Sequence, residues 1–390
     1  MLESHRTDHK KIAVIVPFPL KGLTSATEED WASIAEMLRD RFEIEFFCLS
    51  NRNFSNAHFM GHRLHEINES LPRWSISDLT TLALLGYRPS LNKDYPILRE
   101  RLDEYAPDYI ITGEIVIYKF IKDYMDKHKG IKLILITDSP EGIEKFNIKI
   151  LDYMGYGFIK PFVSKNYTKL HMRLYENMLG MSHSVITNSE YYKEKIQKRY
   201  PKYSRKINGV TYRFLKKLPK LVVRKEINKI LFMGDYLNTS NREAIENIEL
   251  IASHVPDKIF IIAGRNTPKM KNGNVIYYGE LTKAGKEKLY NEIDLCIAPI
   301  ITGSGLKAKM IDYFFHNKLT LGTSIAFAGV LGAVNGKNAI IEDDIKRYPD
   351  RISELDKDPA KFMRMQRDLY LIIKHYSKEE IKKSFNRAVR

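Results

Sequence analysis

Short, almost unbroken apolar runs alternate along this chain with stretches of helical spacing, and the alternation occurs in two blocks. Unbroken runs rich in Val and Ile are typical of parallel strands that are covered on both faces. Repeated strand–helix units of this kind predict an α/β fold with doubly wound sheets. In the first block the strand-like runs are Lys11–Val16, Ile44–Leu49, Tyr109–Thr112, Leu133–Thr137 and Ser184–Thr187, with helical stretches such as Glu28–Arg39 and Ile115–His128. In the second block they are Lys229–Met233, Ile259–Ala263, Val275–Tyr278, Leu295–Ala298 and Leu319–Gly322, with helical stretches at Arg242–His254, Ala284–Glu292 and Lys307–Phe315.

A basic stretch without periodicity, residues 214–226, separates the two blocks. We therefore expect a first domain over residues 1–213, a linker over 214–226, a second domain over 227–362 and closing helices over 363–390 that pack back toward the first domain. The expected architecture is two doubly wound, Rossmann-like domains that face each other across a cleft. Ligands of such sheets bind outside the carboxyl ends of the strands, so the loops that follow the strands are where function is expected.

The net charge of +15 is concentrated, because the segment from Leu151 to Lys225 holds 17 Lys or Arg against 4 Asp or Glu. A basic region suits nucleic acid, an anionic membrane surface or a phosphate-bearing substrate. No signature of a nucleic-acid-binding fold accompanies the charge, so nucleic acid is not expected as a partner. No apolar run is long enough for a transmembrane helix, and the start of the chain does not resemble a secretory signal.

The two cysteines, Cys48 and Cys296, lie within strand-like runs and have no metal-binding spacing. We expect them to be buried, reduced thiols, and we expect neither a metal nor a cofactor. The expected location is cytoplasmic, with a possible peripheral position on the inner face of the cell membrane that follows from the basic charge.

A glycine-rich turn between a strand and a helix is the strongest functional signal in the chain. The strand ends at Ala298, and the segment Gly303-Ser304-Gly305-Leu306 precedes the helix. Glycines allow the backbone to approach a ligand closely, and the free amides at a helix start attract phosphate. Two lysines and one carboxylate that could accept hydrogen bonds from ribose hydroxyls follow at Lys307, Lys309 and Asp312.

Two other phosphate-binding motifs are absent. The turn lacks the G-x-x-x-x-G-K-[ST] spacing of a P-loop, and no G-x-G-x-x-G follows the first strand, which argues against a dinucleotide-dependent dehydrogenase.

The run GSGLKAKMIDYFFHNKLTLGTSIAFAGVLGAVNGKNAIIEDD resembles the donor-binding region of glycosyltransferase family four, a GT-B family of retaining enzymes. Asn208-Gly209-Val210 with Phe214 resembles the hinge entry of that family, and Phe260–Arg265 resembles a strand of its second domain. The family often carries two glutamates eight positions apart, where this chain has Ser304 and Asp312. The resemblance covers most of residues 10–390 and is more specific in the later half.

The resemblance implies a retaining hexosyltransferase, active in polysaccharide biosynthesis, that uses a UDP- or GDP-linked sugar without a metal. It implies that the base lies near Arg265 and that the diphosphate lies at the helix start after Gly305. Lys309 and Arg242 would assist the diphosphate, and Gly22 would approach it from the first domain. Glu114 and Asp138, which both follow strand-like runs of the first domain, are the candidate catalytic carboxylates, with capping or surface positions as the alternative.

The acceptor implied by the resemblance is a glycan or a lipid-linked sugar. The stretch Phe158–Met181 mixes aromatic residues with lysines, so a basic helix on an anionic membrane is one interpretation, and a helix packed on the first-domain sheet is the other. Three alternatives to a transferase stay open: a nucleotide-sugar epimerase, a catalytically inactive relative, and a basic protein that binds nucleic acid or a membrane surface.

Overall fold

The computed structural model describes residues 9–18, 20, 26–50, 58–71, 75–85, 88–137, 160–303 and 305–389. These residues form two compact units. The first unit comprises Met1–Tyr212 together with Lys382–Arg390, and the second unit comprises Arg213–Ile381. The chain therefore enters the second unit once and returns to the first for its last residues.

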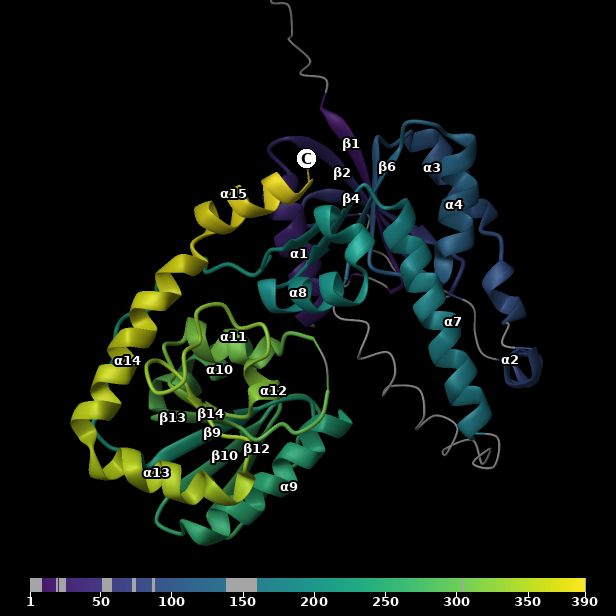
Figure 1. Ribbon diagram of the computed structural model, residues 1–390. Helices are drawn as coiled ribbons and strands as arrows, with labels where there is room; N and C mark the ends of the chain where they lie inside the picture. Colours follow the sequence, from purple (N-terminus) through teal and green to yellow (C-terminus); the bar gives the residue numbers. More distant parts are fainter. Residues whose placement is uncertain are drawn as a thin grey trace, which may run out of the picture. The chain divides into compact units, whose positions relative to one another are not determined.

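The first unit is built on an eight-stranded sheet in the order β3-β4-β2-β1-β5-β6-β7-β8. Every neighbouring pair is parallel except the edge pair β3–β4, which is antiparallel. Figure 1 labels β1, β2, β4 and β6 of this sheet. The strands are β1 (Lys10–Val16), β2 (Phe42–Leu49), β3 (His58–Phe59), β4 (His62–Ile67), β5 (Tyr109–Thr112), β6 (Lys132–Ile136), β7 (Ser184–Thr187) and β8 (Ile207–Gly209).

Helices cover this sheet because its central strands are apolar on both faces. All four residues of β5 and of β7 are buried, and so are the last five of β1. The helices are α1 (Ala26–Leu38), α2 (Ile76–Leu85), α3 (Pro96–Tyr105), α4 (Tyr118–Lys127), α7 (Lys160–Met181), α8 (Glu190–Arg199) and α15 (Lys378–Val389), with 3₁₀ turns η1 (Pro89–Asn92), η2 (Ile115–Ile117) and η3 (Pro201–Lys206).

The second unit repeats this design with seven strands in the order β11-β12-β10-β9-β13-β14-β15, of which only the pair β11–β12 is antiparallel. The strands are β9 (Lys229–Met233), β10 (Ile259–Ala263), β11 (Lys269–Asn272), β12 (Val275–Gly279), β13 (Leu295–Ala298), β14 (Thr320–Gly322) and β15 (Ile340–Ile341). The helices are α9 (Thr239–His254), α10 (Lys283–Glu292), α11 (Ala308–Phe315), α12 (Ser324–Phe327), α13 (Tyr348–Lys357) and α14 (Pro359–Ile373), with 3₁₀ turns η4 (Ile345–Arg347) and η5 (Lys374–Tyr376).

These two sheets confirm the predicted fold class of paired, doubly wound α/β domains. Residues 214–226 contain no helix and only one isolated bridge, between Leu215 and Ser377. Both cysteines are free and buried, as expected, and burial raises the pKa of each thiol.

The apolar side of α7 packs against the first-unit sheet and its helices. Tyr175, Met178 and Leu179 are at most 1% exposed and belong to the same hydrophobic core as β5 and β6. The interpretation of α7 as a helix whose apolar face lies on a membrane is therefore wrong for these residues, because protein side chains already cover that face. Among the described helices, none is both long enough and apolar enough to cross a bilayer.

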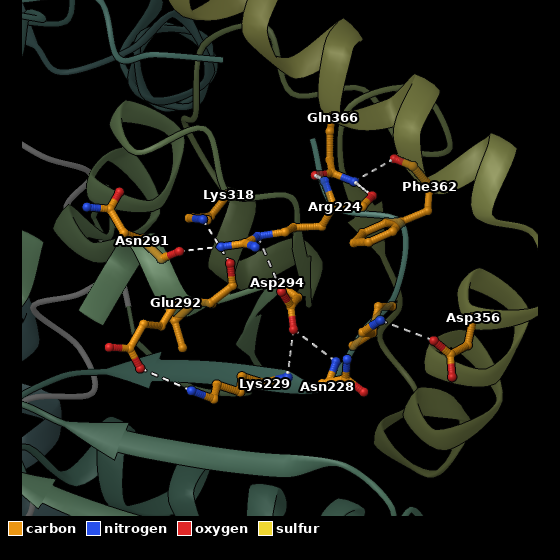
Figure 2. A network of polar contacts seen from close by, with 12 residues as sticks. Arg224, Asn228, Lys229, Asn291, Glu292, Asp294, Lys318, Asp356, Phe362 and Gln366 are labelled. Carbon is orange, nitrogen blue, oxygen red and sulfur yellow. Dashed lines mark hydrogen bonds and ion pairs between the residues drawn. The ribbon is translucent and has the colours of Figure 1, made fainter. Parts of the chain in front are cut away.

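A polar network holds the segment of the second unit that leads into β9 (Figure 2). The Asp294 carboxylate accepts hydrogen bonds of 2.9 Å from the backbone amides of Asn228 and Lys229, and it lies 3.4 Å from Nε of Arg224. The Gln366 side chain bonds both backbone groups of Arg224, accepting from its amide and donating to its carbonyl. The start of β9 is thereby held to the loop before β13 and to α14.

Candidate functional site

The candidate site of the second unit lies where its strand order reverses. The first strand of the unit, β9, has β10 on one side and β13 on the other, so the loops after β9 and β13 diverge to opposite faces of the sheet. Open α/β sheets bind ligands in the crevice that this divergence leaves at the carboxyl ends of the strands. The loop after β9 begins with Gly234, and the loop after β13 contains the predicted glycine turn.

The glycine turn has the backbone conformation that its sequence requires. Gly303 has a φ of 113° and Gly305 a φ of 74°, both in the left-handed range that side chains disfavour. A methyl group built on Gly303 would lie 3.6 Å from Cε of Lys307 and 3.8 Å from Oγ of Ser240. The turn therefore passes between the start of α11 and the start of α9, so two helix N-termini lie in one small region.

Lys309 extends from the first turn of α11 toward α9. Its ammonium lies 2.5 Å from Oδ1 of Asn241 and 4.0 Å from the ring centroid of Phe232, a cation–π distance. A Cβ atom on Gly234 would lie only 2.9 Å from the Lys309 ammonium and 2.7 Å from Nδ2 of Asn241. A side chain at position 234 would therefore have to displace the lysine and the asparagine, which fill the space beside Gly234.

The charge of Lys309 has no carboxylate to balance it: among the described residues, none lies within ion-pair distance of its ammonium. Burial, together with the positive charge of Lys307, lowers the pKa of Lys309 to about 7. Lys307 itself donates to the carbonyl oxygen of Gly305 at 2.8 Å. A cation that is partly desolvated and uncompensated binds an anion with little competition from its own protein, so this corner of the second unit is suited to phosphate.

The start of α9 supplies the other wall of the site. Asn238 caps this helix, since its Oδ1 accepts from the amides of Ser240 and Asn241 at 3.0 and 3.3 Å. Asn241 also donates from Nδ2 to the carbonyl of Asp235 at 2.9 Å, which fixes its amide and turns Oδ1 toward Lys309. The predicted site residue Arg242 is the next residue, and its side chain is exposed.

The other predicted donor-binding side chains are already held by protein partners. The Asp312 carboxylate accepts from Nζ of Lys286, in α10, at 2.7 Å, and Nε of Arg265 lies 3.0 Å from Oδ2 of Asp235. Burial opposes the ionisation of Asp235, but hydrogen bonds from Asn266, from the Leu237 amide and from Arg265 outweigh it and lower its pKa. Leu306, the remaining residue of the turn, packs partly buried against the second-unit core.

Of the residues predicted in the first unit, Glu114 is described by the structure, whereas Gly22 and Asp138 lie outside the described residues, as does Ser304 of the second unit. Glu114 follows β5, next to β1 at the point where the strand order of the first sheet reverses. Its Oε1 accepts from the Val116 amide at 3.3 Å and so caps η2, which is the alternative that the sequence left open. Burial raises the pKa of Glu114 in spite of this hydrogen bond.

Several residues of the candidate site in the second unit were not predicted as site residues from the sequence: Phe232, Gly234, Asp235, Asn238, Asn241 and Lys286. Three of these, Gly234, Asp235 and Asn238, had a local signal. Gly234-Asp235 directly follows a strand, and Asn238-Thr239-Ser240 has the composition of a helix N-cap. Lys286 had none, because its partner Asp312 lies on another helix. Among the described residues, no three His, Cys, Asp or Glu side chains lie close enough together to hold a metal ion.

Comparison with known proteins finds solved structures of the same fold and no relative by sequence. The sequence matches no protein-family model and none of the curated proteins. The chain resembles the solved structure of sucrose-phosphate synthase from Thermosynechococcus elongatus with a TM-score of 0.71 and 13% identity over 98% of both chains. It also resembles HepE of Anabaena, solved with UDP and glucose, with a TM-score of 0.65 and 13% identity over 98% of this chain and 99% of that one.

A third similar structure is the lipopolysaccharide outer core galactosyltransferase WaaB, with a TM-score of 0.63 and 12% identity over 97% of this chain and 99% of that one. At such identities the likeness establishes the fold, which is the GT-B fold of two doubly wound α/β domains.

Proposed function

We propose that this protein is a glycosyltransferase that moves a sugar from a UDP- or GDP-linked donor to a glycan or lipid-linked acceptor, with retention and without a metal. The structures with the same fold over nearly the whole chain include a sucrose-phosphate synthase and a galactosyltransferase, and a third, HepE, was solved with UDP and glucose. The resemblance of the segment from Gly303 to Asp312 to a donor-binding region supports the same conclusion.

The single observation that carries the proposal is the Lys309 ammonium beside the glycine turn. It is a cation without a carboxylate partner among the described residues, held by Asn241 and Phe232 at the reversal point of the sheet. When a sugar leaves a nucleoside diphosphate, negative charge grows on the diphosphate oxygens. A fixed cation and fixed amides directed at those oxygens stabilise that charge, and so they accelerate transfer.

The other residues have roles that follow from their positions. The amides after Gly305, at the start of α11, would bind a phosphate oxygen. Asp312, oriented by Lys286, would accept hydrogen bonds from ribose hydroxyls through the oxygen that Lys286 does not occupy. Arg265, fixed by Asp235, would lie beside the base. In the first unit, the raised pKa of Glu114 suits a carboxyl group that exchanges a proton during transfer.

Calorimetry with a panel of UDP- and GDP-sugars tests the proposal most directly. We expect one base to bind in the micromolar to millimolar range, and we expect the purified protein to release nucleoside diphosphate when the acceptor is supplied. Binding of no nucleotide sugar by a folded protein would contradict the proposal. Conversion of a bound nucleotide sugar into its epimer would favour the epimerase alternative, and binding without any turnover would favour an inactive relative.

A further inference from the structure

A basic stripe runs along the solvent side of α7. Lys165, Lys169 and Arg173 are all exposed and recur every four residues, so they lie on one face of the helix over a length of about 12 Å. No described residue forms an ion pair with any of the three. The opposite side of α7 is buried in the first-unit core, so the stripe is the face that α7 presents to solvent.

Two leucines at the end of α2 lie close to this stripe. Leu84 and Leu85 are 82% and 77% exposed, the highest values among the exposed large hydrophobic residues. Helix α2 packs against α7, as Figure 1 also shows, and Nδ2 of Asn166 donates to the carbonyl of Leu82 at 3.0 Å. Asn166 is the neighbour of Lys165, so the leucine pair and the start of the stripe lie next to each other.

The carboxylates of these two helices do not offset the basic stripe. Within the described parts of α2 and α7 the acidic side chains are Asp78 and Glu176. Asp78 is 1% exposed and lies 3.8 Å from Nε of Arg88, and Glu176 is paired with Nζ of Lys202 at 2.6 Å. The surface therefore combines a largely exposed apolar pair with three cations that no carboxylate among the described residues pairs with.

We propose that Leu84 and Leu85 together with the stripe Lys165–Lys169–Arg173 form a docking surface for an anionic lipid bilayer. Exposed leucines gain free energy when they leave water for the acyl boundary, and each nearby Lys or Arg is attracted to the anionic headgroups. A folded acidic protein would have to bury the leucines in a matching pocket, whereas a bilayer accepts two adjacent leucines without one. The inference is independent of the proposed transferase activity.

Co-sedimentation of the full-length protein with vesicles tests this surface. Vesicles of phosphatidylcholine are compared with vesicles that also contain phosphatidylglycerol, at low and at high salt. We expect binding only to the anionic vesicles, and we expect added salt to weaken it. The stripe variant Lys165→Gln/Lys169→Gln/Arg173→Gln should partition roughly a hundredfold less, since each basic residue near a membrane contributes about 1 kcal/mol. The tip variant Leu84→Ser/Leu85→Ser should bind at least about tenfold less.

Matched variants in the second unit separate this surface from general charge and hydrophobicity. Lys271→Gln/Lys283→Gln/Lys288→Gln removes three exposed cations, and Leu250→Ser/Leu371→Ser removes two exposed leucines, which are 52% and 56% exposed. Both controls should bind anionic vesicles like the wild type. The proposal is overturned if the wild type does not bind anionic vesicles or binds neutral vesicles as strongly as anionic ones. It is also overturned if either control loses as much binding to anionic vesicles as its matched variant. Circular dichroism of each variant verifies that the fold is retained.

Discussion

Replacing Lys309 by methionine separates the binding role of its ammonium from any structural role. Methionine keeps the length of the side chain and can still contact the Phe232 ring, but it removes the charge that lies 4.0 Å from the ring centroid and 2.5 Å from Oδ1 of Asn241. A charge-assisted hydrogen bond to a phosphate oxygen contributes about 1.5–3 kcal/mol. At 1.4 kcal/mol per factor of ten, the variant should bind a nucleotide sugar about 10- to 150-fold more weakly.

The stability of the variant should change little, because two effects oppose each other. Loss of an uncompensated, partly desolvated cation stabilises the fold, whereas Asn241 Oδ1 loses its partner. Calorimetry with the preferred UDP- or GDP-sugar and a thermal melt are run in parallel, with Lys288→Met as a control that removes an exposed lysine of the same unit. The reasoning fails if Lys309→Met binds the donor like the wild type, or if its binding loss is matched by the control. A large fall in melting temperature would assign the loss to unfolding instead.

Four further predictions follow from Lys309, Gly234 and Glu114 as the structure describes them. The pKa of Lys309 is about 7 without ligand, so nucleotide-sugar affinity should fall as pH rises above 7. Calorimetry in buffers of different ionisation enthalpy should detect proton uptake on binding. Lys309→Met should show neither effect. In the unfolded chain a lysine keeps its proton up to about pH 10.4, whereas Lys309 in the folded protein loses it near pH 7. The free energy of unfolding of the wild type should therefore rise with pH above 7. Denaturant titrations at pH 7 and 9 should show a smaller rise in Lys309→Met. Gly234→Ala places a methyl group 2.7 Å from Nδ2 of Asn241 and 2.9 Å from the Lys309 ammonium, so it should displace both and reduce donor affinity at least tenfold. Gly273→Ala is the control, because nothing lies within 4 Å of its added carbon, and it should leave donor affinity unchanged. Glu114→Gln should lower kcat at least about a hundredfold with donor affinity unchanged if the carboxyl group exchanges a proton, whereas unchanged turnover would reduce Glu114 to a cap of η2.

The sequence predicted the sheets well because their strands carry a strong local signal. Runs such as Lys229–Met233 and Ile259–Ala263 were located to the residue, since a buried parallel strand is a short, continuous apolar segment bounded by polar ones. Edge elements were missed where that signal is absent. The strand β11 (Lys269–Asn272) is exposed along its whole length and pairs only with β12, so no apolar pattern distinguishes it from a loop.

The glycine turn was found because it is contiguous in the sequence, whereas the partners of its lysine were not. Lys309 and Asn241 are 68 residues apart and meet only because β9 and β13 are adjacent in the sheet. The pairing of Asp312 with Lys286 depends in the same way on how α10 and α11 lie beside each other. A single sequence predicts such a pair only when the order of the strands is already known.

The last helix has a consequence for how the protein is made. In α15, Phe385 is fully buried and Val389 is 2% exposed, Oγ of Ser184 donates to the carbonyl of Ala388, and Lys382 pairs with Asp40. The first unit therefore includes residues that leave the ribosome only after all of Arg213–Ile381 has been synthesised. Translation thus delays completion of this core, and a fragment that stops at Tyr212 would lack one wall of it. A recombinant version of the first unit alone should carry residues 382–389 joined through a designed connection.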